Sequence, residues 1–323
     1  MSTLTSYSYM NLAEAMKREN YPDAAGLLGE LQKNNEFLDH CPWFPATHGT
    51  YNEQTQATRL GKGAFSKANS AIPVISSGTS TIQEPVKMYE GESIVDDRIL
   101  RTARFPERVR DSEDILSLEG AFQDWVKNVF YGNEGTEPDN FRSLARRRAS
   151  LGTYCVSAGG SGGDTTSAWI IEFGRSAFHL AYPPGDGSPG LKNIDKGLQR
   201  VNAPDGTGQM YAWVRYYAIE GALVLRNERC LLRYANIEIS GTSNTFDFKT
   251  FATLRNKLQS VGRNAVVFMN RDLKGQMEAV AYGDVKNGAL TIRDIQGMGP
   301  VTYIMGIPIA LAECITSTET AVT

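Results

Sequence analysis

An apolar run near the end of the chain, residues 301–315, constrains the fold more than any other segment. The run is predicted to be a strand, but Gly306 and Pro308 stand two residues apart within it. Proline has no backbone N–H for a strand ladder, so this strand lies at a sheet edge or is bent at Pro308. Gly306 allows a bulge or a close approach by a neighbouring backbone. Both residues are therefore predicted to have structural roles.

The composition excludes several classes of protein. The chain has 323 residues, enough for two domains, and 41% of them are hydrophobic, which argues against general disorder. Its formal net charge of -3 gives no global basic field, so dedicated binding of free nucleic acid is not expected. No apolar run approaches the roughly 20 residues of a membrane-spanning helix, and we expect neither a membrane span nor a secretion signal.

The cysteines and histidines predict no disulfide and no metal site. The four cysteines are Cys41, Cys155, Cys230 and Cys314. They are widely spaced without a Cys-x-x-Cys pair, which is typical of reduced, mostly buried thiols in a protein made in a cytosol. Three histidines are present, at no usual zinc-ligand spacing, and the local group of His40, Cys41 and His48 is not expected to hold metal.

No motif predicts catalysis or a cofactor. The glycine-rich residues 158–166 lack the Lys-Ser/Thr ending of a nucleotide-binding loop, and a strand is predicted to follow them, so they are interpreted as a connector. The chain has no Gly-x-Ser-x-Gly sequence and no histidine in a suggestive position beside a serine or cysteine. We therefore predict that the protein is not an enzyme.

The N-terminal residues are predicted to form an arm. A helix is expected to begin near Asn11, and a second helix is expected over residues 23–38. The Pro-Trp-Phe-Pro sequence at 42–45 stops any helix and exposes two aromatic side chains, Trp43 and Phe44.

Residues 49–92 are predicted to be extended and to lack a core of their own. Glycines interrupt long polar stretches in which apolar residues are isolated. Such a segment is either a flexible surface loop or an arm that lies on a partner. We favour a long two-stranded arm stabilised by neighbouring subunits, because the alternation of polar and apolar residues persists throughout it. Its candidate contact residues are Arg59, Lys62, Phe65 and Lys67.

Downstream, the pattern predicts one long helix followed by strands. Acidic residues at the start and an apolar stripe from Ile115 to Val129 predict a helix over 112–131, closed by Gly132. Residues 155–239 have the β-branched and aromatic runs of strands, and a unit of helices and a buried strand follows over 247–300.

The order of these segments resembles that of a known family. The segments that carry the resemblance are Phe130-Tyr-Gly-Asn133, Pro138, Phe141-Arg-Ser-Leu144, Ala168 to Gly174, Arg229 to Ile237 and Gly306-Ile-Pro-Ile309. Together they resemble the major capsid proteins of short-tailed double-stranded DNA bacteriophages. The resemblance covers nearly the whole chain, and its specificity lies in the order of the motifs. It implies an α+β, Hong Kong 97-type capsid fold.

The resemblance also implies a division of the chain and a set of partners. The expected parts are an N-terminal arm (1–48), an E-loop (49–92), a P-domain with the spine helix 112–131 (93–152), a strand-rich segment of the P- or A-domain (153–240), an A-domain (241–300) and a strand returning to the P-domain (301–323). Copies would form pentamers and hexamers of an icosahedral head in the virion, after synthesis in the cytoplasm of the bacterial host. Portal, scaffolding and cement proteins and packaged double-stranded DNA are the implied partners.

The sequence leaves open the role of one basic run and the presence of a crosslink between subunits. The basic residues Arg146, Arg147 and Arg148 are either solvated or in ion pairs between subunits, with acids such as Asp96 and Asp97, or they contact phosphates of enclosed DNA. Some relatives join subunits by a Lys-Asn isopeptide bond, but the sequence singles out no Asn and Glu partners for Lys62 or Lys67. We therefore expect no crosslink.

Two rival functions are weighed against a phage coat. An encapsulin-like nanocompartment shell protein would share the fold, but the sequence fits short-tailed phage subunits better. A cytosolic oligomeric enzyme could use residues 49–92 as a mobile lid. Such a lid would cover a group of convergent polar residues, and the sequence offers no such group.

Overall fold

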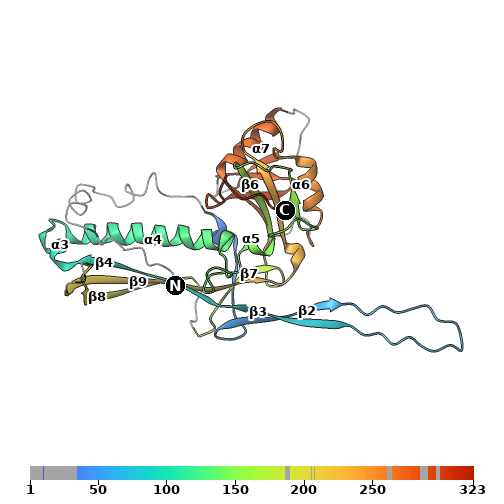
Figure 1. The fold of residues 1–323 in the computed structure, drawn as a ribbon, viewed down its shortest axis with the longest axis horizontal. Helices are drawn as coiled ribbons and strands as arrows, with labels where there is room; N and C mark the ends of the chain where they lie inside the picture. The colour runs from blue at the N-terminus through green and yellow to red at the C-terminus, as the bar shows by residue number, and fades with distance from the viewer. Residues whose placement is uncertain are drawn as a thin grey trace.

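The computed structural model describes residues 10, 35–185, 190–204, 206, 208–259, 264–283, 290–295 and 299–323. The helix expected near Asn11 and most of the one expected over 23–38 lie outside these residues, and the described part begins with a short helix, α2 (Phe37–His40). The described chain forms two packed parts, from which a long hairpin projects (Figure 1). The architecture is α+β, as predicted.

The first part is a long helix on a five-stranded sheet. Helix α4 (Pro106–Tyr131) lies along the sheet, and the short helix α3 (Asp97–Thr102) precedes it. The strands are β1 (Trp43–Pro45), β4 (Lys87–Asp96), β7 (Phe178–Tyr182), β8 (Leu191–Asn202) and β9 (Gln209–Leu225). Strand β9 is central: it pairs antiparallel with β4 on one side and with β7 and β8 on the other. Strand β1 adds to β7 in parallel.

Helix α4 begins six residues earlier than the predicted residue 112. Its first residue is Pro106, whose fixed φ and missing N–H suit the first turn of a helix. It ends as predicted, because the N–H of Gly132 donates to the carbonyl of Asn128 at 2.8 Å and closes the last turn.

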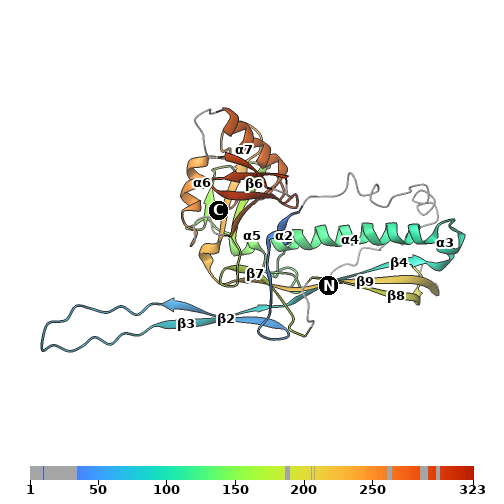
Figure 2. The same ribbon diagram turned by 180° about the vertical axis from the view of Figure 1, so that it is seen from behind.

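The second part is a seven-stranded sheet with helices α6 (Phe248–Arg255) and α7 (Arg271–Gly283) packed against it (Figure 2). Its strand order is β12-β13-β14-β11-β6-β10-β5. The bounds are β5 (Cys155–Ser157), β6 (Thr165–Glu172), β10 (Leu231–Glu238), β11 (Ala265–Met269), β12 (Leu290–Ile295), β13 (Gly299–Ile304) and β14 (Ile307–Leu311). Two short elements, α5 (Leu144–Arg147) and the 3-10 turn Glu228–Cys230, lie between the two parts of the chain. None of the helices in the described ranges is long and apolar enough to span a membrane.

The predicted closing strand over 301–315 is a hairpin instead. Strands β13 and β14 pair antiparallel, with Ile304 opposite Ile307, and the turn between them consists of Met305 at φ 47° and Gly306 at φ 84°. Two consecutive positive φ angles give the two-residue turn whose twist matches antiparallel strands. A Cβ at Gly306 would have no neighbour within 4 Å, so the expected close approach by another backbone is wrong and the glycine serves the turn.

The expected return of this segment to the sheet beside the long helix is also wrong. Strand β14 pairs in parallel with β11 and thus belongs to the seven-stranded sheet. Pro308 lies near the start of β14, opposite Tyr303, where a strand tolerates a missing N–H.

A shared aromatic core joins the two parts. Trp125 and Phe130 from the last turns of α4 are fully buried, together with Trp169 of β6 and Phe268 of β11. The other face of the seven-stranded sheet packs against α6 and α7 in a separate apolar cluster. All four cysteines are buried with free thiols, and burial raises the pKa of the Cys230 thiol to about 12.

Candidate assembly surface

The long hairpin is the feature of the molecule that lies outside both packed parts. It consists of β2 (Tyr51–Arg59) and β3 (Gly78–Pro85), paired antiparallel from Tyr51 opposite Pro85 to Arg59 opposite Gly78. Residues 60–77 connect the strands at the far end (Figure 1). The structure confirms the predicted two-stranded arm, but the arm ends at Pro85, because residues 87–96 form β4 of the five-stranded sheet. We call residues 51–85 the arm and residues 60–77 its tip.

Buried polar contacts fasten the base of the arm to the rest of the subunit. The guanidinium of Arg147 forms two parallel hydrogen bonds with the carboxylate of Glu84, at 2.8 and 2.9 Å, and also donates to the carbonyl of Leu223. On β2, Gln54 Nε2 donates to the Leu225 carbonyl at 3.0 Å. These bonds set the direction in which the arm leaves the sheet.

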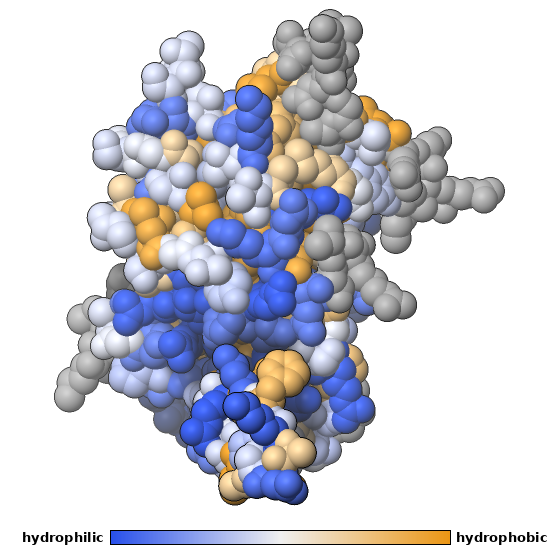
Figure 3. Space-filling view, turned by 90° about the vertical axis from the view of Figure 1, so that its right-hand side faces the viewer, coloured by the Kyte–Doolittle hydropathy of each residue, from blue (hydrophilic) through white to orange (hydrophobic). Residues whose placement is uncertain are grey.

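The tip has large apolar side chains that no described residue of the same chain covers. Val74 is 95% exposed and Ile72 is 86% exposed. The full set of exposed large apolar residues at the tip is Leu60, Phe65, Ile72, Val74 and Ile75. Figure 3 views the molecule from the side toward which the arm points, and hydrophobic atoms lie among hydrophilic ones at its protruding end. Monomeric proteins rarely expose so many large apolar side chains together, and such patches mark interaction surfaces.

Away from its base, the charge of the arm is one-sided as well. Arg59, Lys62 and Lys67 are basic, and the sequence contains no Asp or Glu between Glu53 and Glu84. Arg59 donates to Ser76 Oγ across the hairpin at 2.7 Å. The tip therefore presents a basic and apolar surface, which fits a partner with acidic and apolar side chains.

The two aromatic residues predicted to contact other subunits are engaged within the subunit. The ring of Trp43 stacks on that of Trp125, with centroids 6.3 Å apart, and it fills the space that a Cβ at Gly221 would need. The ring of Phe44 packs edge-to-face against the imidazole ring of His179, with centroids 5.2 Å apart. The sequence reveals neither contact, because each joins residues that are far apart in the chain.

The basic run after α4 is also largely turned inward. Arg147 holds Glu84 in the arm, and Arg148 is buried, donating to the carbonyls of Leu231 and Glu228 at 2.9 and 2.6 Å. Of the three arginines, Arg146 alone is exposed.

The acids named as their partners, Asp96 and Asp97, pair instead with Arg98 and Arg101 at 2.9 and 2.8 Å. Partial burial acts to raise the pKa of Asp96, but hydrogen bonds from Arg98 and the charges of Arg98 and Arg101 together outweigh it and hold the pKa below its usual value. These ion pairs lie at the corner of α3, far along the chain from Arg146, Arg147 and Arg148.

The described ranges contain no group of three or more His, Cys, Asp or Glu side chains placed to hold a metal ion. The predicted structural pair, Gly306 and Pro308, lies with Phe44 and Phe173 around an open hollow of about 590 Å³ between the two sheets. The other residues around the hollow are His40, Pro42, Gly174, Asn264, Ala265, Val266 and Tyr303. The exposed apolar and basic tip of the arm is the candidate surface for association.

Comparison with known proteins places the chain in context. A family profile described as "Major capsid protein GP7" matches residues 23–323. A chain of the cryo-EM structure of bacteriophage Epsilon15 is 21% identical, with 99% of each chain covered and a TM-score of 0.72. A chain of the bacteriophage JBD30 capsid is 10% identical, with 97% of each chain covered and a TM-score of 0.52. No curated protein matches this chain.

Proposed function

The chain belongs to the major capsid protein GP7 family, and on that premise we propose that its phage is short-tailed and that its head encloses double-stranded DNA. The protein is the major capsid protein of a phage icosahedral head, and it has the Hong Kong 97-type fold. Its activity is self-association and not catalysis. Pentamers and hexamers of one subunit tile such a head.

The exposed apolar tip of the arm is the observation that carries the assembly mechanism. Full burial of one large apolar side chain contributes about 1.5–3 kcal/mol, and the tip offers five of them. Each subunit in a closed shell both gives an arm and receives one, so this contribution is repeated at every interface. The tip of one copy therefore lies on an acidic and apolar surface of a neighbouring copy.

Within this mechanism, the contact residues of the arm are Arg59, Lys62, Phe65 and Lys67. All four are exposed in the free subunit, which supports a role between copies. Trp43, Phe44, Arg147 and Arg148 make their contacts inside the subunit instead, and of these Arg147 bonds directly to Glu84 at the base of the arm.

The named parts of the fold are assigned by their packing. The arm is the E-loop, α4 with the five-stranded sheet is the P-domain, and the seven-stranded sheet with α6 and α7 is the A-domain. The strand-rich residues 153–240 then divide between the two domains: β7, β8 and β9 go to the P-domain, and β5, β6 and β10 to the A-domain.

The other partners follow from the function of a head. A portal, scaffolding proteins and cement proteins would contact assembled subunits. DNA inside the head would meet the shell through non-specific phosphate contacts, for which Arg146 is the available member of the basic run.

Electron microscopy of the purified protein tests the proposal. We expect closed shells, or rings of five and six copies, in solutions of this chain. Denatured, reduced shells should migrate near 35.5 kDa on a gel, because no crosslink is expected between subunits. Uniform monomers at high protein concentration, with or without a scaffolding protein, would contradict the assembly mechanism.

A further inference from the structure

The last described segment of the chain, residues 312–323, crosses one end of the seven-stranded sheet; we call it the crossing segment. It leaves β14 with the N–H of Ala312 donating to the Met269 carbonyl at 3.0 Å. The N–H of Glu319 donates to the Thr165 carbonyl of β6 at 2.8 Å. The backbone of Val322 then exchanges two hydrogen bonds with the side chain of Asn236, at 2.8 and 2.9 Å. The crossing segment is thus fixed to three strands in succession.

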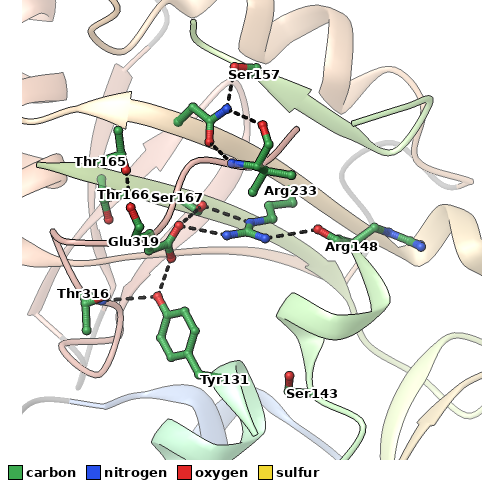
Figure 4. A network of polar contacts seen from close by, with 12 residues as sticks. Tyr131, Ser143, Arg148, Ser157, Thr165, Thr166, Ser167, Arg233, Thr316 and Glu319 are labelled. Carbon is green, nitrogen blue, oxygen red and sulfur yellow. Dashed lines mark hydrogen bonds and ion pairs between the residues drawn. The ribbon is translucent and has the colours of Figure 1, made fainter. Parts of the chain in front are cut away.

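The carboxylate of Glu319 is the centre of a buried network on this segment (Figure 4). Arg233 Nη2 donates to Glu319 Oε2 at 2.9 Å, and Ser167 Oγ donates to the same oxygen. Arg233 Nε also donates to Ser167 Oγ at 3.0 Å. The side chains of Arg233 and Glu319 are each 5% exposed. The guanidinium lies over the ring of Trp169, 4.9 Å from its centroid, so its position is fixed on several sides.

The other oxygen of this carboxylate reaches the long helix. Tyr131, the last residue of α4, donates its hydroxyl to Glu319 Oε1, and the N–H of Thr316 donates to the same hydroxyl at 3.3 Å. Burial and the negative charge of Glu319 raise the pKa of Tyr131, so its hydroxyl stays a donor. Glu319 thus bonds to β6, to β10 and to the end of α4 with one side chain.

This network constrains the orientation of α4 relative to the seven-stranded sheet, which the aromatic core does not. The apolar contacts between α4 and the seven-stranded sheet hold the two parts together but have little directionality. A buried carboxylate with three donors from three elements tolerates little rotation, because any movement leaves a buried polar atom unpaired.

We propose that the Tyr131–Glu319–Arg233 network sets the angle between α4 and the seven-stranded sheet, and thereby the curvature of the shell. The inference rests on the function as a shell subunit. In a closed assembly the same subunit geometry is repeated at every position, so a small change of angle in each copy changes the size at which the shell closes. Tyr131 and Glu319 are positioning residues for assembly, and they need not touch a neighbouring copy.

The test replaces one hydroxyl and measures particle size. Tyr131→Phe removes the bond from α4 to Glu319 and keeps the ring in the core. Tyr234→Phe is the matched control, because it also loses a buried tyrosine hydroxyl, one that accepts from the N–H of Asp247 and takes no part in the network. Shells of each variant are measured by cryo-electron microscopy, and subunit folding is measured by circular dichroism.

We expect folded Tyr131→Phe subunits whose particles have a shifted or broadened diameter distribution, or form open sheets and tubes. Tyr234→Phe should give particles of the wild-type diameter. Failure of this inference would still leave closed shells, whereas failure of the proposed function would leave no shells from the wild-type protein. Tyr131→Phe shells with the wild-type diameter distribution would overturn the proposal. Insoluble Tyr131→Phe protein would overturn it as well, because the network would then serve folding and not geometry.

Discussion

Glu84, at the base of the arm, and Arg147, the last residue of α5, form a two-pronged ion pair with bonds of 2.8 and 2.9 Å. Their side chains are 8% and 7% exposed, so neither charge is well solvated by water. The pair joins the arm to α5, across 63 residues of sequence. Removing one partner leaves a buried charge without compensation, which is more costly than the loss of a surface ion pair.

Arg147→Ala should therefore lower the free energy of unfolding by about 3–5 kcal/mol. Arg142→Ala is the control, because Arg142 is 58% exposed and its nitrogen lies 3.9 Å from Glu134. That control should lose less than about 1 kcal/mol. Urea denaturation of the free subunits measures both. A double variant, Glu84→Met with Arg147→Met, should recover most of the loss. Equal losses of unfolding free energy for Arg147→Ala and Arg142→Ala would contradict a buried ion pair at Arg147.

Substitution by alanine should have opposite effects on the stability of the subunit at Gly306 and at Gly275. Gly306→Ala places a side chain at φ 84° and should cost about 1–2 kcal/mol. Gly275→Ala, on the exposed side of α7, should instead stabilise the subunit by about 0.5–1 kcal/mol. Thermal or urea unfolding gives both signs. Stabilisation by Gly306→Ala would contradict the turn assignment.

Because His179 is buried, we expect the free energy of unfolding to fall in mild acid. Its ring is 3% exposed, and burial, with the charge of Arg226 and Arg175, lowers its pKa from 6.5 to about 4. Between these two values the unfolded chain binds a proton that the folded chain does not, so the free energy of unfolding falls as the pH falls. The contribution is complete above about pH 6.5, and its loss amounts to at most about 3 kcal/mol near pH 4.

A histidine variant isolates this effect. We expect His179→Gln to have a shallower dependence of unfolding free energy on pH between 4 and 6.5 than the wild type. His48→Gln, which changes an exposed histidine, is the matched control. Identical pH profiles for wild type and His179→Gln would show that His179 does not couple to folding.

Polar substitution of the arm tip should separate assembly from stability. Phe65→Ser and Val74→Ser change exposed side chains, so the subunit should unfold within about 0.5 kcal/mol of the wild type. Their assembly yield should fall strongly, because the apolar area that a neighbour would bury is lost. Val280→Ser, which changes an exposed apolar residue of α7, should assemble normally. Sedimentation of shells measures the yield, and normal yields for both tip variants would contradict a contact by the tip.

Local patterns in the sequence predicted the elements that depend on neighbouring residues. The long helix, its end at Gly132 and the two strands of the arm follow from periodicity and from glycine positions. The helix start was missed because the acidic residues at 111–114 resemble a first turn, whereas Pro106 at the first helical position is the actual signal.

Long-range contacts could not be predicted from one sequence. Nothing near Arg147 indicates Glu84, and nothing near Tyr131 indicates Glu319, because each pair meets only through the packing of several elements. The same reason explains the incorrect placement of residues 301–315. An apolar strand fits either sheet, and only its pairing with β11 assigns it to the seven-stranded one.

Trypsin protection of the arm tests the central claim, that the tip is covered by a neighbouring copy, most directly. Arg59, Lys62 and Lys67 are exposed cleavage sites in the free subunit, within a segment that has no core of its own. Free subunits and purified shells are digested side by side, and cleavage at these three sites is followed by mass spectrometry. We expect rapid cleavage at these sites in the free subunit and protection of the same sites in shells. Equal cleavage rates in both states would contradict it.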